Sequence, residues 1–217
     1  MTPLIKALVF DFDGVIVDSN HVKGDAFVAL YADHGDVVTA KVRAFHEAHG
    51  GMPRADKFRH FQRDLIDGPA DEATIVELGR RFGDRVKEEV KRVPEIAGAR
   101  EALAALSARM PLHMASATPQ GELTEIVEAR GLAGYFTSIH GVPTSKTEAL
   151  RMRIAEGFAP DEILMVGDAT ADHAAAVAAG TRFLGIVAPG GVNRFPGGTV
   201  THADLTGLTA FVTGEAA

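Results

Sequence analysis

The sequence contains no cysteine, so it can form neither disulfide bonds nor thiolate metal sites. It also lacks any long hydrophobic run, since stretches such as Ala7 to Phe10 are far too short to cross a bilayer. The first residues show no charged segment followed by a longer apolar segment and a small-residue cleavage site, so no secretory signal is expected. These absences favour a cytoplasmic protein without a membrane partner.

An excess of positive charge is also missing. The 22 Lys and Arg residues are outnumbered by 29 Asp and Glu residues, which gives a formal net charge of −7. Nucleic-acid binding depends on a basic surface, so we expect no nucleic-acid partner. A local basic cluster consists of Arg54, Lys57, Arg59 and Arg63, and its favoured interpretation is the solvated face of a helix.

The 217 residues, 46% of them hydrophobic, suffice for one large domain or for a domain with a smaller insert. Short apolar runs ended by turn residues are typical of strands buried on both faces of a parallel sheet. They span residues 4–10, 112–116, 163–167 and 183–187. Helical patterns lie between the later runs, at residues 99–109, 121–129, 146–156 and 171–179. This alternation predicts an α/β fold with a doubly wound, mainly parallel sheet.

Residues 19–93 interrupt this alternation. They contain no convincing strand pattern but several amphipathic stretches with hydrophobic residues three or four positions apart, such as Phe58, Phe61 and Leu65. We therefore predict an all-helical insert over residues 19–93, here called the helical insert. The Rossmann-like core would then consist of residues 1–18 and 94–217.

Two acids, Asp11 and Asp13, follow the first predicted strand and are separated by one residue. Alternate residues of an extended chain point to the same side, so both carboxylates can face one site. Gly14 comes next and would let the backbone turn sharply or approach a ligand closely. The alternative is an ordinary turn that ends the strand.

Polar residues also follow the other predicted strands. Ser116 ends the second run, Asp168 follows the third, and Asp172 lies four residues further on, in the first turn of a helix. Lys146 opens another helix, where a cation opposes the helix dipole. Helix capping or a solvated surface could explain each of these residues singly. Because ligands of such sheets bind at the carboxyl ends of the strands, we expect the residues to converge on one crevice.

These motifs, in this order, resemble those of the haloacid dehalogenase superfamily, specifically its phosphatase and phosphomutase branch. The resemblance extends over essentially the whole chain. The helical insert is similar to the cap of the phosphoglycolate phosphatase and β-phosphoglucomutase group. The matching residues are Asp11 to Val15 with Asp18 and Ser19, then Ser116, then Lys146, and finally Gly167, Asp168 and Asp172.

The resemblance implies a role for each acid. Asp11 would attack phosphorus and become an aspartyl phosphate, and Asp13 would act as general acid and then as general base. Asp11, Asp168 and the backbone carbonyl of Asp13 would bind Mg²⁺, which prefers oxygen ligands. Asp172 would lie near the metal or orient its waters.

It also implies how the substrate is held. Ser116, Lys146 and Gly14 would bind the phosphoryl group. The segment from Gly50 to Arg54 resembles the substrate-specificity loop of the cap. Gly51 and Arg54 are its candidate residues, and the fork of Arg54 suits a second anionic group on the substrate.

The resemblance therefore implies a Mg²⁺-dependent phosphatase that hydrolyses a small phosphorylated metabolite, of the sugar phosphate or phosphoglycolate type. A phosphomutase of the β-phosphoglucomutase type remains an alternative, although Lys23 replaces the hinge histidine of that enzyme. A non-catalytic binding protein on the same fold is the other alternative. Asp13 argues against dehalogenase chemistry. A phosphonatase would need a lysine in the insert that forms a Schiff base, and Lys57 is available for this. That family has a small residue at the position of Asp13, so Asp13 argues against a phosphonatase as well. We expect a monomer or a homodimer.

Overall fold

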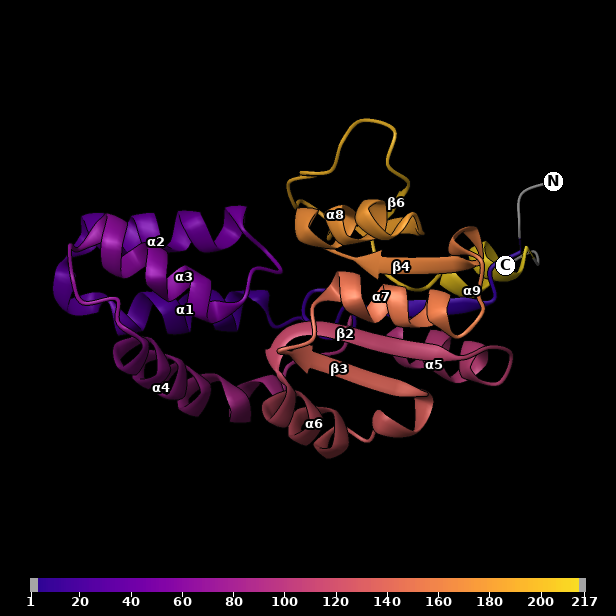
Figure 1. Cartoon of the computed structure of the whole chain (residues 1–217), viewed down its shortest axis with the longest axis horizontal. Helices are drawn as coiled ribbons and strands as arrows, with labels where there is room; N and C mark the ends of the chain where they lie inside the picture. Colours follow the sequence, from indigo (N-terminus) through magenta and orange to yellow (C-terminus); the bar gives the residue numbers. More distant parts are fainter. Residues whose placement is uncertain (1–3, 215–217) are drawn as a thin grey trace.

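A computed structural model describes residues 4–214 of the chain and contains one six-stranded sheet in the order β3-β2-β1-β4-β5-β6. All neighbouring strands in it are parallel. This confirms the predicted α/β fold with a doubly wound parallel sheet (Figure 1). The strands are β1 (Ala7–Phe10), β2 (Leu112–Pro119), β3 (Ser138–Val142), β4 (Ile163–Gly167), β5 (Arg182–Ile186) and β6 (Thr201–His202).

Helices cover both faces of the sheet, and those of the helical insert extend beyond its carboxyl edge (Figure 1). The α-helices are α1 (Asn20–Leu30), α2 (Asp36–Ala48), α3 (Arg54–His60), α4 (Glu72–Val90), α5 (Ala99–Ser107), α6 (Gln120–Ala129), α7 (Lys146–Ala155), α8 (Thr170–Ala179) and α9 (Leu208–Thr213). Shorter helical turns are η1 (Ala32–His34), η2 (Phe61–Leu65, a π-helix), η3 (Ala133–Tyr135) and η4 (Pro160–Glu162). No helix among the described residues is long and apolar enough to cross a membrane.

The two faces of the sheet have separate hydrophobic cores. Ala7 and Val9 of β1 belong to the core under α7 and α8, whereas Leu8 and Phe10 belong to the core under α5, α6 and α9. Alternate residues of a strand point to opposite faces, so a strand buried on both sides must be apolar throughout. This explains why the continuous apolar runs predicted the central strands.

Two strands were not predicted. β3 lies at one edge of the sheet, and its Ser138 and His140 are only half-buried, so its sequence is not a continuous apolar run. β6 lies at the other edge and is two residues long. The predicted strand at 112–116 was too short, because β2 continues to Pro119 through a shift in register after Ala115.

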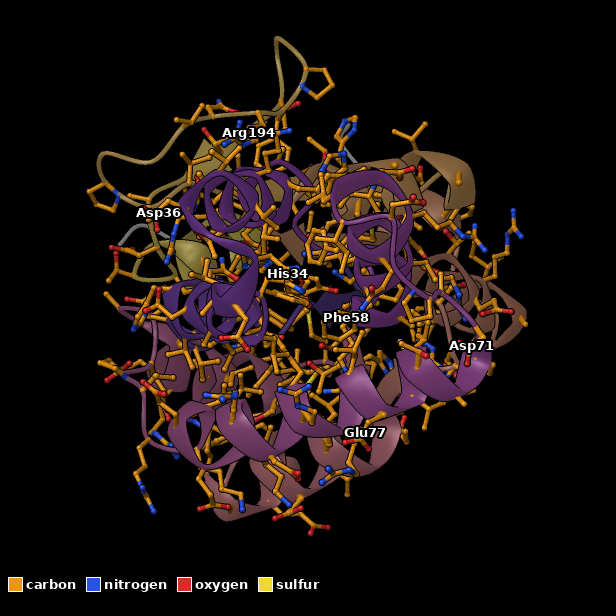
Figure 2. The ribbon with its side chains drawn as sticks, turned by 90° about the vertical axis from the view of Figure 1, so that its left-hand side faces the viewer. His34, Asp36, Phe58, Asp71, Glu77 and Arg194 are labelled. Carbon is orange, nitrogen blue, oxygen red and sulfur yellow. The ribbon has the colours of Figure 1, made fainter. Side chains whose placement is uncertain are left out.

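The helical insert consists of α1 to α4, η1 and η2, as the sequence predicted for this region. Its helices pack around an aromatic cluster, in which the Phe27 ring lies 4.3 Å from Phe82 and 5.3 Å from Phe58, measured between ring centroids. Seen from the end of the insert, Phe58 lies near the centre, and Asp71 and Glu77 lie at the periphery (Figure 2). The insert therefore has an apolar interior of its own.

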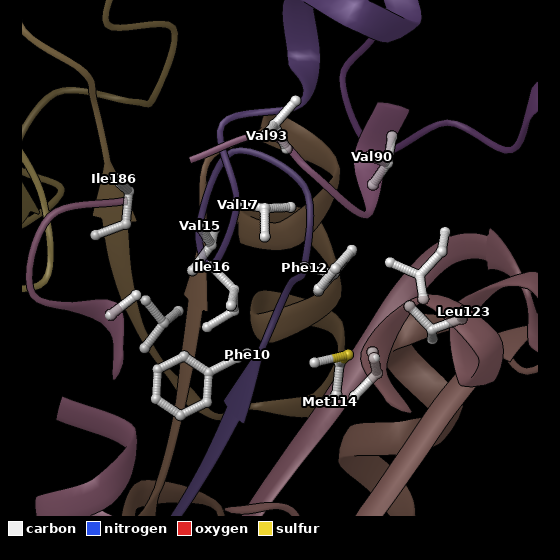
Figure 3. Close-up of a cluster of buried hydrophobic side chains, with 14 of the residues drawn as sticks. Phe10, Phe12, Val15, Ile16, Val17, Val90, Val93, Met114, Leu123 and Ile186 are labelled. Carbon is white, nitrogen blue, oxygen red and sulfur yellow. The ribbon is translucent and has the colours of Figure 1, made fainter. Parts of the chain in front are cut away.

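The chain enters and leaves the helical insert through adjacent segments. Val17 forms an isolated bridge with Glu95, which joins the exit from β1 to the return of the chain after α4. Around this junction, Phe12 and Ile16 belong to the same hydrophobic cluster as Val90 of α4 (Figure 3). This continuous packing holds the insert against the carboxyl edge of the sheet.

We expect Phe58→Ala to lower the free energy of unfolding by about 3–5 kcal/mol, because Phe58 is fully buried and its removal leaves a cavity. Urea unfolding followed by circular dichroism measures this loss. The matched control is Val76→Ala on α4, where the side chain is 61% exposed and a change within about 0.5 kcal/mol is expected. Equal effects of the two substitutions would contradict the proposed aromatic core.

Candidate active site

Three carboxylates meet at the carboxyl edge of the sheet. Asp11 follows β1, Asp168 follows β4, and Asp172 lies in the first turn of α8. β1 and β4 are paired in register, with Phe10 opposite Val166, so the residues that follow the two strands are neighbours. One carboxylate oxygen from each acid lies within 4.8 Å of the others. The side chains of Asp11 and Asp172 are almost inaccessible to solvent.

Lys146 provides positive charge between two of these acids. Its Nζ lies 2.6 Å from Asp11 Oδ2 and also donates a hydrogen bond to Asp172 Oδ1. Ser145 caps α7 by accepting from the backbone N–H of Glu148, which makes Lys146 the first residue of the helix. Burial alone would lower the pKa of Lys146, but Asp11 and Asp172 outweigh it and raise that pKa above its ordinary value. The lysine is therefore charged.

A single lysine does not balance three closely spaced acids, of which Asp11 and Asp172 are buried and Asp168 is half-buried. Burial and the neighbouring carboxylates raise the pKa of Asp11 well above its ordinary value, although Lys146 opposes the shift. Burial and Asp172 raise the pKa of Asp168 to about 7. Closely spaced carboxylate oxygens that lack sufficient positive charge fit a divalent cation such as Mg²⁺. Asp11, Asp168 and Asp172 are thus the residues that could hold a metal.

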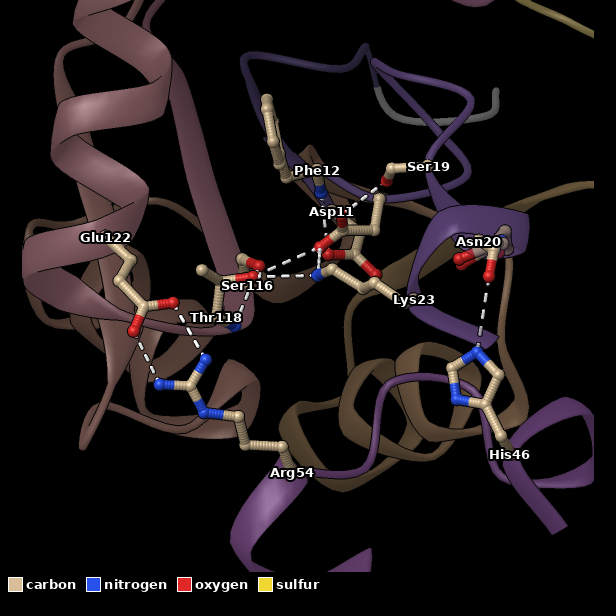
Figure 4. A network of polar contacts seen from close by, with 12 residues as sticks. Asp11, Phe12, Ser19, Asn20, Lys23, His46, Arg54, Ser116, Thr118 and Glu122 are labelled. Carbon is tan, nitrogen blue, oxygen red and sulfur yellow. Dashed lines mark hydrogen bonds and ion pairs between the residues drawn. The ribbon is translucent and has the colours of Figure 1, made fainter. Parts of the chain in front are cut away.

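Asp13 has a separate set of partners, namely Ser19, Lys23 and Thr118, which are labelled in Figure 4. Ser19 Oγ donates to Asp13 Oδ1 at 2.5 Å, and Lys23 Nζ lies 2.5 Å from Asp13 Oδ2. Thr118 Oγ1 donates to the same Oδ2 at 3.2 Å. Burial would raise the pKa of Asp13, but Lys23 and these hydrogen bonds outweigh it and lower that pKa below its ordinary value. Asp13 is therefore ionised in this arrangement.

The start of the helical insert is tied to the acids. Asn20 Nδ2 donates to Asp168 Oδ2 at 2.7 Å, three residues before Lys23 reaches Asp13. Gly14 lies beneath this contact with φ of +74°, and a Cβ atom there would lie 2.1 Å from Asp168 Oδ2. Only glycine avoids both the backbone strain and the collision.

Ser116 lies inside β2 and not at the strand end that the sequence predicted. Its Oγ accepts a hydrogen bond from the backbone N–H of Thr118 at 3.1 Å. Because Phe10 pairs with Met114, Ser116 is level with the residues that follow β1. Thr118, which contacts both Asp13 and Lys23, was not among the predicted site residues. Its position two residues after Ser116 on an extended chain was the available signal.

Gly51 and Arg54 lie in and just after the loop between α2 and α3. A Cβ atom on Gly51 would lie 3.3 Å from Lys146 Nζ, so this loop reaches the carboxylate cluster. The guanidinium of Arg54 instead donates two hydrogen bonds to Glu122 of α6, at 2.8 and 2.5 Å. In this conformation the fork that was expected to bind substrate is occupied by Glu122 (Figure 4). No local pattern predicts that partner, because Glu122 lies 68 positions away in the sequence.

The prediction that the basic cluster is a solvated helix face is wrong for two of its four members. Arg54 and Lys57 point inward and line a cavity, whereas Arg63 is exposed and Arg59 bonds exposed acids at the surface. Arg54 and Lys57 are three residues apart on α3, a spacing that puts them on one side of a helix. Phe58, next to Lys57, is fully buried.

The cavity lies between the sheet edge and the helical insert and has a volume of about 560 Å³. Its polar end includes Asp11, Asp13 and Asp168 from the core. Apolar side chains of α4, such as Phe82 and Val86, line another part of it. A pocket of this size and mixed lining suits a small molecule with one highly charged end.

We expect Gly14→Ala to weaken Mg²⁺ binding by roughly 10- to 100-fold, because the new methyl group would displace the carboxylate of Asp168. Isothermal titration calorimetry measures this affinity. The control is Gly131→Ala, where φ is also positive at +65° but no atom lies within 4 Å of the added Cβ. If the two variants bind Mg²⁺ equally well, Asp168 is not a ligand.

The comparisons with known proteins agree with this geometry. A family model described as haloacid dehalogenase-like hydrolase matches residues 5–180. A phosphoglycolate phosphatase of Rhodospirillum rubrum is 29% identical over 184 residues, which cover 81% of this chain and 76% of that protein. A phosphorylated carbohydrates phosphatase of Thermotoga maritima is 27% identical over 197 residues, covering 84% of this chain and 86% of that protein.

Solved structures show the same fold. The structure of a protein titled a predicted phosphoglycolate phosphatase from Haemophilus somnus has a TM-score of 0.74 at 19% identity, covering 97% of this chain and 99% of that one. A haloacid dehalogenase-like family protein from Streptococcus pneumoniae has a TM-score of 0.72 at 21% identity, covering 95% and 98%. Because the family model matches most of the sequence, the chain belongs to the haloacid dehalogenase-like hydrolase family, as its motifs predicted.

Proposed function

We propose that the protein is a Mg²⁺-dependent phosphatase that hydrolyses a small phosphorylated metabolite through an aspartyl phosphate on Asp11. The observation that supports this most directly is the close group of Asp11, Asp168 and Asp172 beside Lys146, at the edge of a cavity. The names of the relatives indicate small phosphorylated acids or sugars as substrates. The cavity of about 560 Å³ is compatible with molecules of that size.

The proposed metal ligands are the carboxylates of Asp11 and Asp168 and the backbone carbonyl of Asp13. Mg²⁺ would supply positive charge that offsets these acids and the oxygens of the phosphoryl group. Asp172 would support the site from behind, because it is fully buried and, unlike Asp11 and Asp168, does not line the cavity. Its two oxygens accept hydrogen bonds from Lys146 and from the backbone N–H of Ala169. Asp172 would thus hold Lys146 and the neighbouring acids in place without binding the metal itself.

Asp11 is oriented to act as the nucleophile. Its Oδ1 accepts a hydrogen bond from the backbone N–H of Phe12 at 2.6 Å, and its Oδ2 faces Lys146. Attack of a carboxylate oxygen on phosphorus forms the acyl phosphate, and the bond to the leaving alcohol breaks. The Lys146 ammonium is positioned to stabilise negative charge near this oxygen. Water then cleaves the acyl phosphate and restores Asp11.

Asp13 is proposed to move the protons in both steps. As an ionised group held by Lys23 and Thr118, it is ready to accept a proton from the attacking water in the second step. In the first step, the like charge of an incoming phosphate dianion favours the protonated form of Asp13. That form donates a proton to the leaving oxygen.

The helical insert, which we propose as a separate cap over residues 19–93, would exclude water from these steps. Its Gly51 loop lies against Lys146, and the ion pair of Arg54 with Glu122 joins it to α6. Substrate entry would require these contacts to open, and their closure would complete the site.

We expect Asp11→Asn to reduce phosphate release by at least about a thousandfold, because the amide cannot form the acyl phosphate. Phosphate release from phosphoglycolate and sugar phosphates measures this loss. With radiolabelled phosphate on the substrate, acid quenching should trap labelled wild-type protein but unlabelled variant. The control is Asp33→Asn at an exposed position in η1, which should retain full activity. Substantial activity of Asp11→Asn would refute the proposed mechanism.

Metal removal gives an independent prediction. Mg²⁺ should raise the melting temperature of the wild type, because it binds the folded state, and a chelator should abolish both this rise and activity. Asp168→Asn should lose most of the Mg²⁺-induced rise. Without Mg²⁺ it should melt about 2–4 °C above the wild type, since the substitution relieves repulsion from Asp172. Differential scanning calorimetry measures both effects, and an unchanged Mg²⁺ response would remove Asp168 from the metal site.

A further inference from the structure

Lys57 is a buried lysine in the wall of the cavity that has no acidic partner among residues 4–214. Its side chain belongs to α3 of the helical insert, and the residue is only 3% exposed. Among residues 4–214, its ammonium makes one hydrogen bond, with His46 Nδ1 at 2.9 Å, and no carboxylate lies within 4.0 Å of it. An ammonium has three donors, so two N–H bonds remain available.

The half-buried cations that line the cavity are already paired, and Arg194, which also lines it, is exposed. Lys23 contacts Asp13, and Arg54 is held by both oxygens of Glu122. Arg43, at another part of the wall, contacts Asp25. Buried charges are normally paired, because leaving water costs several kcal/mol per ion. Lys57 is an exception, and a bound anionic ligand would supply the missing negative charge.

His46 positions Lys57 without neutralising it. Burial and Lys57 lower the pKa of His46 to about 4, so its ring is neutral and accepts from Lys57 through Nδ1. The ring proton then lies on Nε2, which faces the carbonyl oxygen of Asn20 at 3.4 Å. Burial and Lys23 lower the pKa of Lys57 to about 7, although the more distant Asp13 and Asp168 oppose the shift. The amine is fixed in place and only partly protonated near pH 7, and an anion bound beside it would favour the charged ammonium.

On the basis of the phosphatase function proposed above, we propose that the substrate is a phosphorylated carboxylic acid whose carboxylate binds Lys57. One unpaired monovalent cation matches the single charge of a carboxylate better than the double charge of a second phosphate. The Phe27 ring, 5.6 Å from Nζ, gives this end of the cavity an apolar wall. In such surroundings a charge-assisted hydrogen bond is stronger than it is in water. Sugar phosphates that carry no second anionic group would leave Lys57 without a partner and would be poorer substrates.

The test uses pairs of phosphate esters that differ only in this group. Phosphoglycolate is compared with 2-hydroxyethyl phosphate, and 3-phosphoglycerate with glycerol 3-phosphate, because each neutral ester replaces a carboxylate by a hydroxymethyl group. In at least one pair, wild-type kcat/KM should favour the acid by roughly ten- to a hundred-fold. Lys57→Met should remove most of this preference, because kcat/KM should fall much more for the acid than for the ester that lacks a carboxylate.

Two further variants control for structure. Lys41→Met makes the same substitution at an exposed position of α2 outside the cavity wall, and should keep the preference. Lys57→Gln retains a hydrogen-bond donor for His46 but no charge, and should lose the preference as Lys57→Met does. Neither substitution at Lys57 should lower the melting temperature, because replacing an uncompensated buried charge does not destabilise the fold. Retention of the preference in both Lys57 variants would overturn the proposal.

Binding separates this inference from the proposed function. Calorimetric titration with each ester, in the absence of Mg²⁺, reports on Lys57 without requiring turnover. If wild type binds the acid more tightly than the neutral ester, and Lys57→Met does not, the carboxylate site stands even if no ester is hydrolysed. Hydrolysis with equal binding of acid and ester by both proteins would retain the phosphatase and reject the carboxylate site.

Discussion

The ion pairs of Lys146 with Asp11 and Asp172 join three segments that are far apart in the sequence. They connect the end of β1 and the first turn of α8 to the start of α7, all at the carboxyl edge of the sheet. The positive charge of the buried lysine is balanced by these two acids. The capping of α7 by Ser145 makes Lys146 the first residue of that helix and so sets its position. Asp168 has no cationic partner in the described chain, so part of the negative charge of the cluster is not balanced. This unbalanced negative charge is the physical reason to expect a metal ion there.

The helical insert is coupled to these acids through its first turn. Asn20 bonds to Asp168, and Lys23 bonds to Asp13, so the position of α1 influences two of the carboxylates. At the opposite side, the Gly51 loop approaches Lys146 as closely as the absence of a side chain allows. Movement of the insert would therefore alter access to the cavity and the surroundings of the acids together. A closing motion of this kind would link substrate entry to completion of the site.

Much of the fold, and of the candidate site at the carboxyl edge of the sheet, could be predicted because both depend on local patterns. Strands buried on both faces have continuous apolar sequences, and parallel topology brings the residues after them to one edge. Edge strands such as β3 lack this pattern and were missed. Arg54 and Lys57 were misjudged for a different reason: helical spacing shows which residues share a face, but not what that face contacts. Only tertiary packing places Glu122 against Arg54 and leaves Lys57 inside the cavity.

This difference separates what the sequence reveals about the reaction from what it reveals about the substrate. Most of the groups that would act on phosphorus lie in or just after parallel strands, so strand register places them relative to one another. The groups that would contact the remainder of the substrate come from helix faces, whose partners are set by long-range contacts. The pattern of ion pairs in the structure identifies residues of this second set. A buried cation whose neighbours already satisfy one another, as Lys57 does beside the paired Lys23 and Arg54, identifies the part of the ligand that the protein itself does not supply.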